Sequence, residues 1–227
     1  AREARLSGHV SVGMAPSTAS VLGVPFINAM RESYPDVRLH LVESLSGNLE
    51  RMINTRQLDL AIVFQQEKIL RWSARPVLEE RLFLIGTHAL LAPLQEDHIS
   101  PDQLTSLPLI MPSQGHGLRG RLEAVCQQHH LSVEVVADID GLALLMQAVR
   151  SGLGATLQPG AAISHLDHQA LRVIDVVNPI LSRPNFLVSL SDDELTPAGL
   201  AARVILSKVM RQLVESDRWP GATLYAH

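Results

Sequence analysis

Strand-like and helix-like patterns of hydrophobic residues alternate along the first third of the chain. Apolar side chains occupy alternate positions in residues 9–14 and 37–42, which is typical of half-buried strands, and residues 58–64 are mostly apolar. Between these strands, residues 17–34 and a segment beginning at Ser46 have apolar residues at helical spacing. The resulting order β-α-β-α-β predicts a parallel sheet with crossover helices.

The remainder of the chain repeats this alternation and predicts a second α/β half. A polar stretch covers 87–106, and a helical turn is expected near 160–166. The predicted strands are 81–86, 107–111, 133–137, 155–157, 171–177 and 185–190, and the predicted helices are 118–130, 141–151 and 197–215. Two similar halves suggest two lobes around a cleft, which is where small ligands usually bind.

Hydroxyl side chains stand where the first two strands end and the next helices begin. They are Ser17, Thr18, Ser44 and Ser46. In open α/β sheets this edge receives ligands, so these groups are candidates for binding a polar or anionic molecule. The alternative is that Ser17 or Thr18, and Ser46, simply cap the helices, with Pro25 as an early break or restart in the first of them.

Composition excludes several classes of protein. The 227 residues are 46% hydrophobic and carry a net charge of −4, so the chain is globular and a poor candidate for binding nucleic-acid phosphates by itself. The single cysteine, Cys126, cannot form an internal disulfide, fits a reducing compartment and is expected to be a buried structural thiol. No apolar run is long enough for a membrane helix, and the charged N-terminus is unlike a signal peptide.

Residues Gly115–Gly120 match the pattern G-x-G-x-x-G, and Asp138 follows the next predicted strand. This resembles a dinucleotide fingerprint, although three residues separate the strand from Gly115 where the fingerprint normally turns at once. A flexible turn before a helix and a loop that binds a small anion through its N–H groups are the other interpretations. Arg119 could then hold a carboxylate at the loop, or be solvated.

The chain shows no convincing catalytic or metal motif. His165, Asp167 and His168 could form part of a metal site, but no third strong ligand is near in sequence, and a solvated turn is favoured. Zincin, Walker and C-x-x-C motifs do not occur, and Ser113 lacks a nucleophile elbow. We therefore expect no enzyme, no metal and no cofactor.

Several short segments stand in a distinctive order along the chain: Gly8–Gly13 with Pro16-Ser17, Tyr34–Val37, Gly47–Leu49, Gln57–Ile62, Pro76–Gly86 and Val149–Pro159. Together they resemble the effector-binding domain of LysR-type transcriptional regulators, and among these the nitrogen-assimilation-control branch. The resemblance covers about residues 6–216. Gln158 departs from the pattern, since many members carry an apolar residue before the proline, and it argues for a polar ligand if it faces the cleft.

The resemblance implies an α/β, two-lobe periplasmic-binding-protein-like (type 2) fold, each lobe a mixed sheet flanked by helices. Lobe I would hold residues 1–86 and 188–227, and lobe II residues 87–187. It also implies a cytoplasmic homodimer of side-by-side antiparallel domains, and a tetramer in the full-length protein. DNA would be bound only through an N-terminal winged helix-turn-helix, which we expect to be absent from this chain.

By position, the resemblance places a small-molecule effector in the cleft, and the polar side chains there suggest a carboxylate or amino-acid-like metabolite. The implied ligand-binding residues are Ser17, Thr18, Ser44, Ser46, Ser113, Gln114, Gly115, Asp138, Thr156 and Gln158. Two alternatives stay open: a free-standing solute-binding protein of the same fold, and an NAD(P)-dependent enzyme that uses Gly115–Gly120. A regulator that works without any effector is a further alternative within the family.

Overall fold

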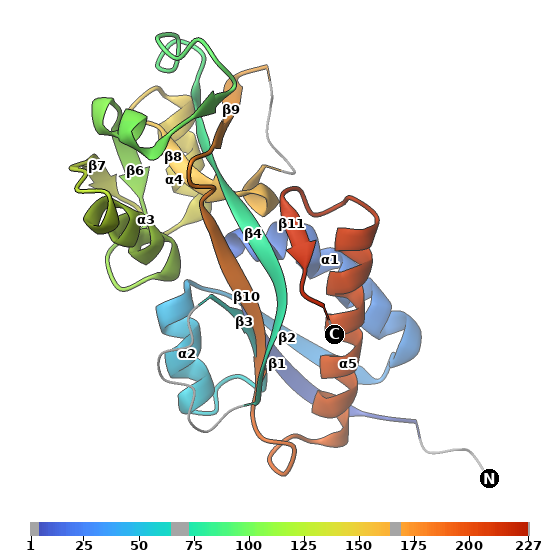
Figure 1. The fold of residues 1–227 in the computed structure, drawn as a ribbon. Helices are drawn as coiled ribbons and strands as arrows, with labels where there is room; N and C mark the ends of the chain where they lie inside the picture. The colour runs from blue at the N-terminus through green and yellow to red at the C-terminus, as the bar shows by residue number, and fades with distance from the viewer. Residues whose placement is uncertain (1–4, 65–72, 164–168, 227) are drawn as a thin grey trace. The chain divides into compact units, whose positions relative to one another are not determined.

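The computed structural model describes residues 5–64, 73–163 and 169–226, and the chain forms two units (Figure 1). Unit 1 consists of Ala1–Glu79 and Pro184–His227, and unit 2 of Glu80–Arg183. The chain passes between them in two strands, β4 (Ser73–Thr87) and β10 (Ser182–Ser189). The lobe boundaries expected from the sequence, after residues 86 and 187, fall within the same two strands.

Unit 1 is built on the predicted β-α-β-α-β arrangement. Its strands β1 (Gly8–Met14), β2 (Val37–Glu43) and β3 (Leu60–Val63) are parallel, and β10 joins them antiparallel to give the order β2-β1-β3-β10. Figure 1 shows α2 (Ser46–Asn54) on one face of this sheet. Helices α1 (Pro16–Ser33) and α5 (Pro197–Glu215) pack together on the other.

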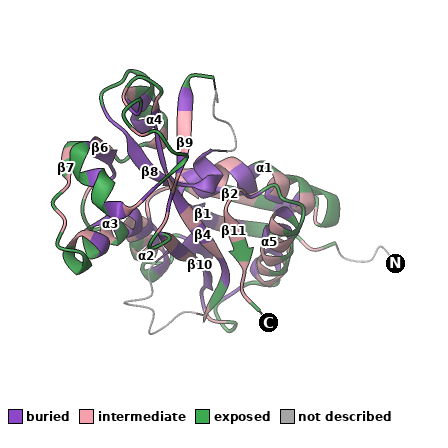
Figure 2. Cartoon of the chain, turned by 45° about the horizontal axis from the view of Figure 1, so that its top comes forward, coloured by how far each residue is buried: buried purple, intermediate pink, exposed green. Residues whose placement is uncertain are grey.

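The alternation seen in the sequence explains how both faces of β1 are covered. Val10, Val12 and Met14 are buried on one face. Gly13 points to the other, where a Cβ atom would lie 2.6 Å from a methyl group of Leu49 on α2. The missing side chain therefore lets α2 pack directly on the sheet backbone. Figure 2 shows the buried strands and the half-exposed helices around them.

Unit 2 has a mixed arrangement around the second half of β4. Strands β8 (Thr156–Pro159) and β9 (Leu171–Val176) pair antiparallel with β4, and the short β5 (His98–Ile99) pairs parallel with β9. Strand β6 (Pro108–Met111) lies parallel to β7 (Glu134–Asp138) and is joined to the start of β8 by the Leu109–Ala155 bridge. The helical segments are α3 (Gly117–Gln128), α4 (Leu142–Arg150) and the 3-10 turns Pro101–Ser106 and Gly160–Ala162.

A buried ion pair marks the point where the two crossing strands change units. Glu80 on β4 and Arg183 on β10 are 0% and 3% exposed, and Arg183 Nε donates to Glu80 Oε2 at 3.0 Å. Burial lowers the pKa of Arg183, and the charge and hydrogen bond of Glu80 oppose that shift. Each charge is costly to bury alone, so the two residues depend on each other.

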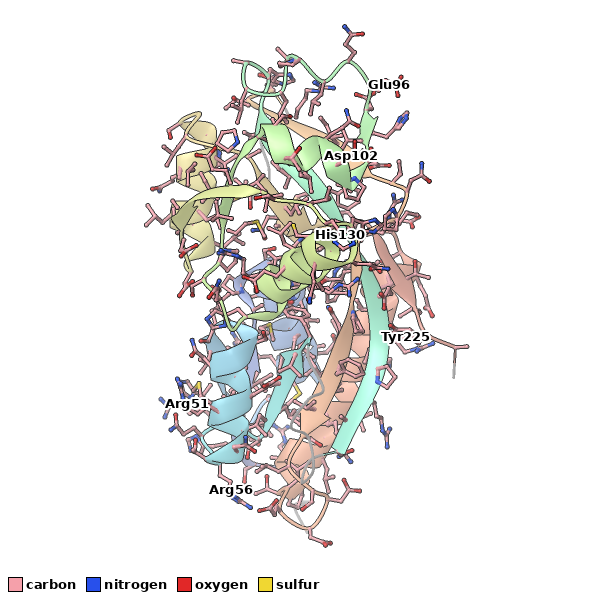
Figure 3. The ribbon with its side chains drawn as sticks, turned by 60° about the vertical axis from the view of Figure 1, so that its left-hand side comes forward. Arg51, Arg56, Glu96, Asp102, His130 and Tyr225 are labelled. Carbon is pink, nitrogen blue, oxygen red and sulfur yellow. The ribbon has the colours of Figure 1, made fainter. Side chains whose placement is uncertain are left out.

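The C-terminal segment adds a strand that the hydrophobic pattern does not predict. Strand β11 (Ala222–Leu224) pairs with β4, and the Tyr225 N–H donates to Val77 O at 3.0 Å. The Tyr225 hydroxyl donates to the Glu79 carboxylate, beside the crossing point (Figure 3). Burial, together with the hydrogen bond to and the charge of Glu79, raises the pKa of Tyr225 to about 12.

Three local predictions are wrong. Pro25 does not break the first helix, because α1 is continuous around it. The N-caps of α1 and α2 are Ala15 and Leu45, so Ser17, Thr18 and Ser46 lie inside the helices rather than capping them. Strand β4 begins eight residues before the predicted strand 81–86. The prediction began too late because the charged residues Glu79 and Glu80 interrupt the apolar pattern, although Glu80 is buried.

The buried ion pair gives a stability prediction. Arg183→Met leaves the Glu80 carboxylate buried without its cation and should cost about 3–5 kcal/mol of unfolding free energy. Glu80→Met with Arg183→Met removes both charges and should recover a large part of that loss. Urea denaturation of the single and double variants measures both effects.

The exposed pair Arg56–Glu194 is the matched control, with side chains 56% and 35% exposed. Arg56→Met should cost about 1 kcal/mol or less, because solvent screens the lost attraction. Equal losses for Arg56→Met and Arg183→Met would contradict a special role for the buried pair.

Candidate functional site

The parallel strands of unit 1 end at one edge of the sheet, where α1 and α2 begin. The chain leaves β1 through α1 to reach β2, and returns through α2, on the opposite face, to β3 (Figure 1). A strand order that reverses in this way, 2-1-3, opens a crevice at the carboxyl ends of the strands. Ligands of open α/β sheets bind in such crevices.

The four hydroxyl residues predicted for this edge are placed along it. Ser17 and Thr18 lie in the first turn of α1, and Ser46 is the first residue of α2; their exposed fractions are 5%, 0% and 2%. Ser44 is half-buried, and its N–H donates to Met14 O at 3.1 Å, which ties the end of β2 to the end of β1. The fold therefore brings the four residues to neighbouring loops of one sheet edge.

Both helices begin at this edge without a side-chain cap. The N-cap residues Ala15 and Leu45 form no capping hydrogen bond through their side chains. The first turn of a helix has N–H groups without intrahelical partners and the positive end of the helix dipole. Two such helix starts at adjacent strand ends favour a negatively charged or polar ligand.

Thr18 carries a buried hydroxyl that has no hydrogen-bond partner among the described residues. The same is true of both polar atoms of the Asn185 side chain, which is 0% exposed. A buried donor or acceptor left unsatisfied costs about 1–3 kcal/mol, so such groups call for a partner that is not part of the chain's own packing.

The strand register places Asn185 close to the same edge. Phe186 pairs with Val63, the last residue of β3, so Asn185 lies one position beyond the end of that strand. Side chains four apart on a strand share a face, and Ser189 on that face accepts a hydrogen bond from Arg203 of α5. Asn185 therefore faces the layer of α1 and α5, to which Thr18 belongs.

Sequence reasoning missed Asn185. Asn185 directly precedes the apolar run Phe186–Val188. The hydrophobic pattern of this strand predicts that its side chains are buried, and it predicts nothing about ligand binding. The one signal was an amide side chain inside a strand expected to be buried, since such groups normally need a hydrogen-bond partner.

Unit 2 has its own polar edge, at the carboxyl ends of β6 and β7 and along the neighbouring β8. Ser113 and Gln114 follow β6, Asp138 ends β7, and Thr156 and Gln158 lie on β8. The Ser113 N–H donates to Asp140 Oδ1 at 2.8 Å, and this hydrogen bond is the main cause that lowers the pKa of Asp140. The predicted residues thus share one edge, while Gln114 and Gly115 are exposed.

The β8 residues at this edge are buried and hydrogen-bonded to each other. Gln158 Nε2 donates to Thr156 Oγ1 at 3.3 Å, and Thr156 Oγ1 lies 3.8 Å from the Met111 sulfur at the end of β6. The two side chains are 3% and 0% exposed. They form a small polar cluster that joins β8 to β6.

Asp138 and Arg119 pair with each other inside this unit. Arg119 Nη1 donates to Asp138 Oδ1 at 2.7 Å and to Pro112 O at 3.1 Å, so it fastens the glycine-containing loop to β7. A dinucleotide fingerprint needs its acidic residue for the ribose hydroxyl. The ion pair engages that carboxylate, which disfavours the dinucleotide interpretation of Gly115–Gly120.

The structure describes one of the remaining candidates predicted from the sequence, Cys126. Cys126 is half-buried rather than fully buried, and burial, with the nearby Glu123, raises the pKa of its thiol, so it is a weak nucleophile. His165, Asp167 and His168 lie outside the described residues. In the described part of the chain, no three His, Cys, Asp or Glu side chains are grouped for a metal ion.

Comparison with known proteins agrees with the sequence motifs and the fold. The family described as "LysR substrate binding domain" matches residues 3–211. The nitrogen assimilation regulatory protein nac of Escherichia coli is 29% identical over 224 residues, covering 94% of this chain and 70% of that protein. Within residues 5–64, 73–163 and 169–226, no helix has the length and apolarity needed to cross a membrane.

Two solved structures share the fold at low sequence identity. One is the effector-binding domain of QuiR in complex with shikimate, with a TM-score of 0.80 and 16% identity, covering 91% of this chain and 99% of that one. The other is the CcmR regulatory domain of Synechocystis PCC6803 in complex with 2-PG, with a TM-score of 0.80 and 17% identity over the same shares. The predicted two-lobe, type 2 periplasmic-binding-protein-like fold is confirmed.

The loop before β8 gives a prediction about the unit 2 edge. A Cβ atom on Gly154 would lie 2.8 Å from Pro108 O and 3.0 Å from the Ile110 side chain, both on β6. Gly154→Ala should therefore push β8 from β6 and cost about 1–3 kcal/mol of unfolding free energy. Gly141→Ala is the matched control, because a Cβ there meets nothing within 4 Å. Urea denaturation of both variants tests this, and equal losses would contradict it.

Proposed function

We propose that this chain, which belongs to the LysR substrate-binding domain family, senses a small carboxylate for a transcription regulator. Its relatives are transcription regulators, and its fold is that of their effector-binding domains. The observation that carries the proposal is the set of buried polar atoms at the switch-point edge of unit 1, on Thr18 and Asn185, that have no partner among the described residues. A ligand would supply the missing hydrogen bonds.

The chemistry of this edge favours a ligand with a carboxylate and at least one other polar group. The Thr18 hydroxyl and the Asn185 amide can each donate a hydrogen bond to a carboxylate oxygen. Asn185 can also accept one, from a hydroxyl or an ammonium group. The uncapped start of α1 favours negative charge at the same place.

The ligands of two fold relatives support this class. QuiR was captured with shikimate, a hydroxylated carboxylic acid, and CcmR with 2-PG. Those ligands belong to those proteins. They support a small polar acid as the class of ligand, and an amino acid would suit the unit 1 edge for the same chemical reasons.

A bound effector would act by selecting one state of the regulator. It shifts an equilibrium only by its difference in affinity for the two states. A tenfold shift needs about 1.4 kcal/mol, which one or two hydrogen bonds made in a single state supply. We propose that this shift reaches DNA through a homodimer, and through a separate DNA-binding domain of the full-length protein.

Two free strand edges are suited to the homodimer. In unit 1, β2 has β1 as its one partner strand, and in unit 2, β7 has only β6, among the described strands. Half-buried or exposed apolar side chains line both edges, including Leu39 and Val136. Val24 on α1 and Leu144 on α4 are 64% and 59% exposed. An isologous dimer would cover such apolar groups in pairs.

The ligand proposal predicts opposite effects on stability and binding. Thr18→Val removes an unsatisfied buried hydroxyl, so unfolding free energy should stay equal or rise by about 1 kcal/mol. The same change should weaken ligand binding at least tenfold, because a hydrogen bond to the ligand is lost. Thermal-shift titration with shikimate, 2-PG, succinate, L-glutamate and L-glutamine measures both; a ligand at 100 times its Kd adds about 2.7 kcal/mol, visible as several degrees.

Thr105→Val, the same substitution at an exposed site in unit 2, is the control and should leave ligand binding unchanged. A ligand whose Kd is the same in the wild type and Thr18→Val would contradict the proposed site. No shift with any compound of the panel would contradict the sensor proposal and favour a regulator that works without an effector.

The dimer proposal predicts that a charged side chain introduced at the outer edge of β7 dissociates the homodimer. Val136→Lys places a cation on the outer edge of β7, where an apolar interface would have to bury it. Light scattering after size-exclusion chromatography should then show a monomer where the wild type is a dimer. Val204→Lys changes an equally apolar residue, 65% exposed on α5, and should leave the dimer intact. A wild type that is monomeric at all concentrations would overturn the proposal.

A further inference from the structure

A second concave surface lies in unit 1, between the start of β4 and the outer side of α5. Its volume is about 760 Å³. One wall is formed by Leu187 of β10 and by four residues of β4, which are Ser73, Arg75, Pro76 and Val77. Side chains of α5 form the other wall. The α5 residues are Arg203, Val204, Ser207, Lys208, Arg211, Gln212 and Glu215. All of these residues belong to unit 1, and none lies at the carboxyl edge of the sheet.

Positive charge is concentrated here, although the whole chain has a net charge of −4. Arg75, Arg203, Lys208 and Arg211 line the pocket, and Glu215 is the one acidic side chain among the described residues of its lining. Arg203 is paired with Asp192, since its Nη1 lies 2.7 Å from Asp192 Oδ1. This pair leaves three cations against a single carboxylate.

Two of these cations have no partner within the part of the chain that the structure describes. Lys208 and Arg211 form neither an ion pair nor a hydrogen bond with those residues. Arg75 differs from these two because it lies near the Asp192 carboxylate. The hydrogen bond and charge of Arg203 are the main causes that lower the pKa of Asp192, and the charge of Arg75 adds to them. The pocket thus has a cationic end on α5 that its own residues do not neutralise.

The pocket also has an apolar wall. Pro76, Val77, Leu187 and Val204 contribute to its lining, and Val204 is 65% exposed in the middle of α5. Apolar surface of this kind next to unpaired cations is suited to a molecule that has an anionic group and a hydrophobic body. Its volume falls in the range of about 300–1,000 Å³ that is common for small-molecule sites.

We propose that this pocket, named here the α5 pocket, binds a small amphipathic organic anion, with Lys208 and Arg211 on the carboxylate or sulfonate and Val204 on the apolar body. The site is separate from the edge that holds Thr18 and Asn185. Because β4 continues from this pocket into unit 2, a ligand here would contact a strand that both units share.

The test is isothermal titration calorimetry of the 227-residue chain with 8-anilinonaphthalene-1-sulfonate, a sulfonate with an apolar body. Lys208→Glu should raise the Kd of this probe at least tenfold. Val204→Phe, which fills the pocket without changing charge, should raise it by a similar factor. The carboxylate 4-phenylbutyrate should compete with the probe, whereas its neutral amide should not.

Arg121→Glu is the matched control, because it makes the same change of charge at an exposed helix position in unit 2. It should change the Kd less than twofold, and Thr18→Val should also leave it unchanged, which separates the α5 pocket from the unit 1 edge. Circular dichroism and thermal midpoints establish that each variant is folded. Absence of probe binding, equal losses for Lys208→Glu and Arg121→Glu, or a loss for Thr18→Val would overturn the proposal.

Discussion

The ion pair between Glu80 and Arg183 constrains the two strands on which the rest of the molecule depends. The chain passes from unit 1 to unit 2 through β4 and returns through β10, and the pair sits at both passages. Both side chains are buried, so a slip of either strand by one residue would separate the charges and turn each strand's other side chains to the wrong face. The ion pair therefore opposes alternative registers more strongly than apolar packing alone would.

The register of β10 also decides where its polar residues lie. Arg183, Asn185, Leu187 and Ser189 share one face of the strand by alternation. That face meets Glu80 at the crossing point, the layer of α1 at the sheet edge, and Arg203 of α5 further along. A single strand thus links the passage between units, the candidate ligand site and the wall of the α5 pocket, where Leu187 lies.

Much of the fold could be predicted from the sequence because its strands alternate and its helices have clear apolar stripes. The early strands and α5 follow those patterns closely. Two features that the pattern missed are decided by partners distant in sequence. The length of β4 depends on Arg183, which makes a buried glutamate tolerable, and the pairing of β11 depends on contacts with Val77 and Glu79.

The sequence predicts the sheet edge at which the candidate site lies, but not which of its polar groups lack a hydrogen-bond partner among the described residues. Strand-end hydroxyls identify the edge, since parallel strands direct their carboxyl ends to one side. They do not reveal which groups keep free hydrogen-bonding capacity. The free capacity depends on where the helices begin, with N-caps at Ala15 and Leu45, and on Asn185, which a strand distant in sequence brings to this edge. Conversely, the glycine pattern at 115–120 resembles a dinucleotide fingerprint in the sequence, and it is the structure that disfavours that interpretation, because Arg119 pairs with Asp138.

The two proposed sites would recognise an anion in different ways, because they lie in different surroundings. The polar groups at the unit 1 edge are buried. A lone cation there would destabilise the ligand-free protein by several kcal/mol, because burial removes its hydration. Hydroxyl and amide groups and helix N-termini attract a carboxylate at much smaller cost, and they select it by hydrogen-bond geometry. The α5 pocket is open to solvent, so its cations stay hydrated and can remain unpaired. The electrostatic attraction between these cations and an anion is screened by solvent and falls as the salt concentration rises. Such a pocket suits a ligand recognised by its charge and apolar area rather than by its shape.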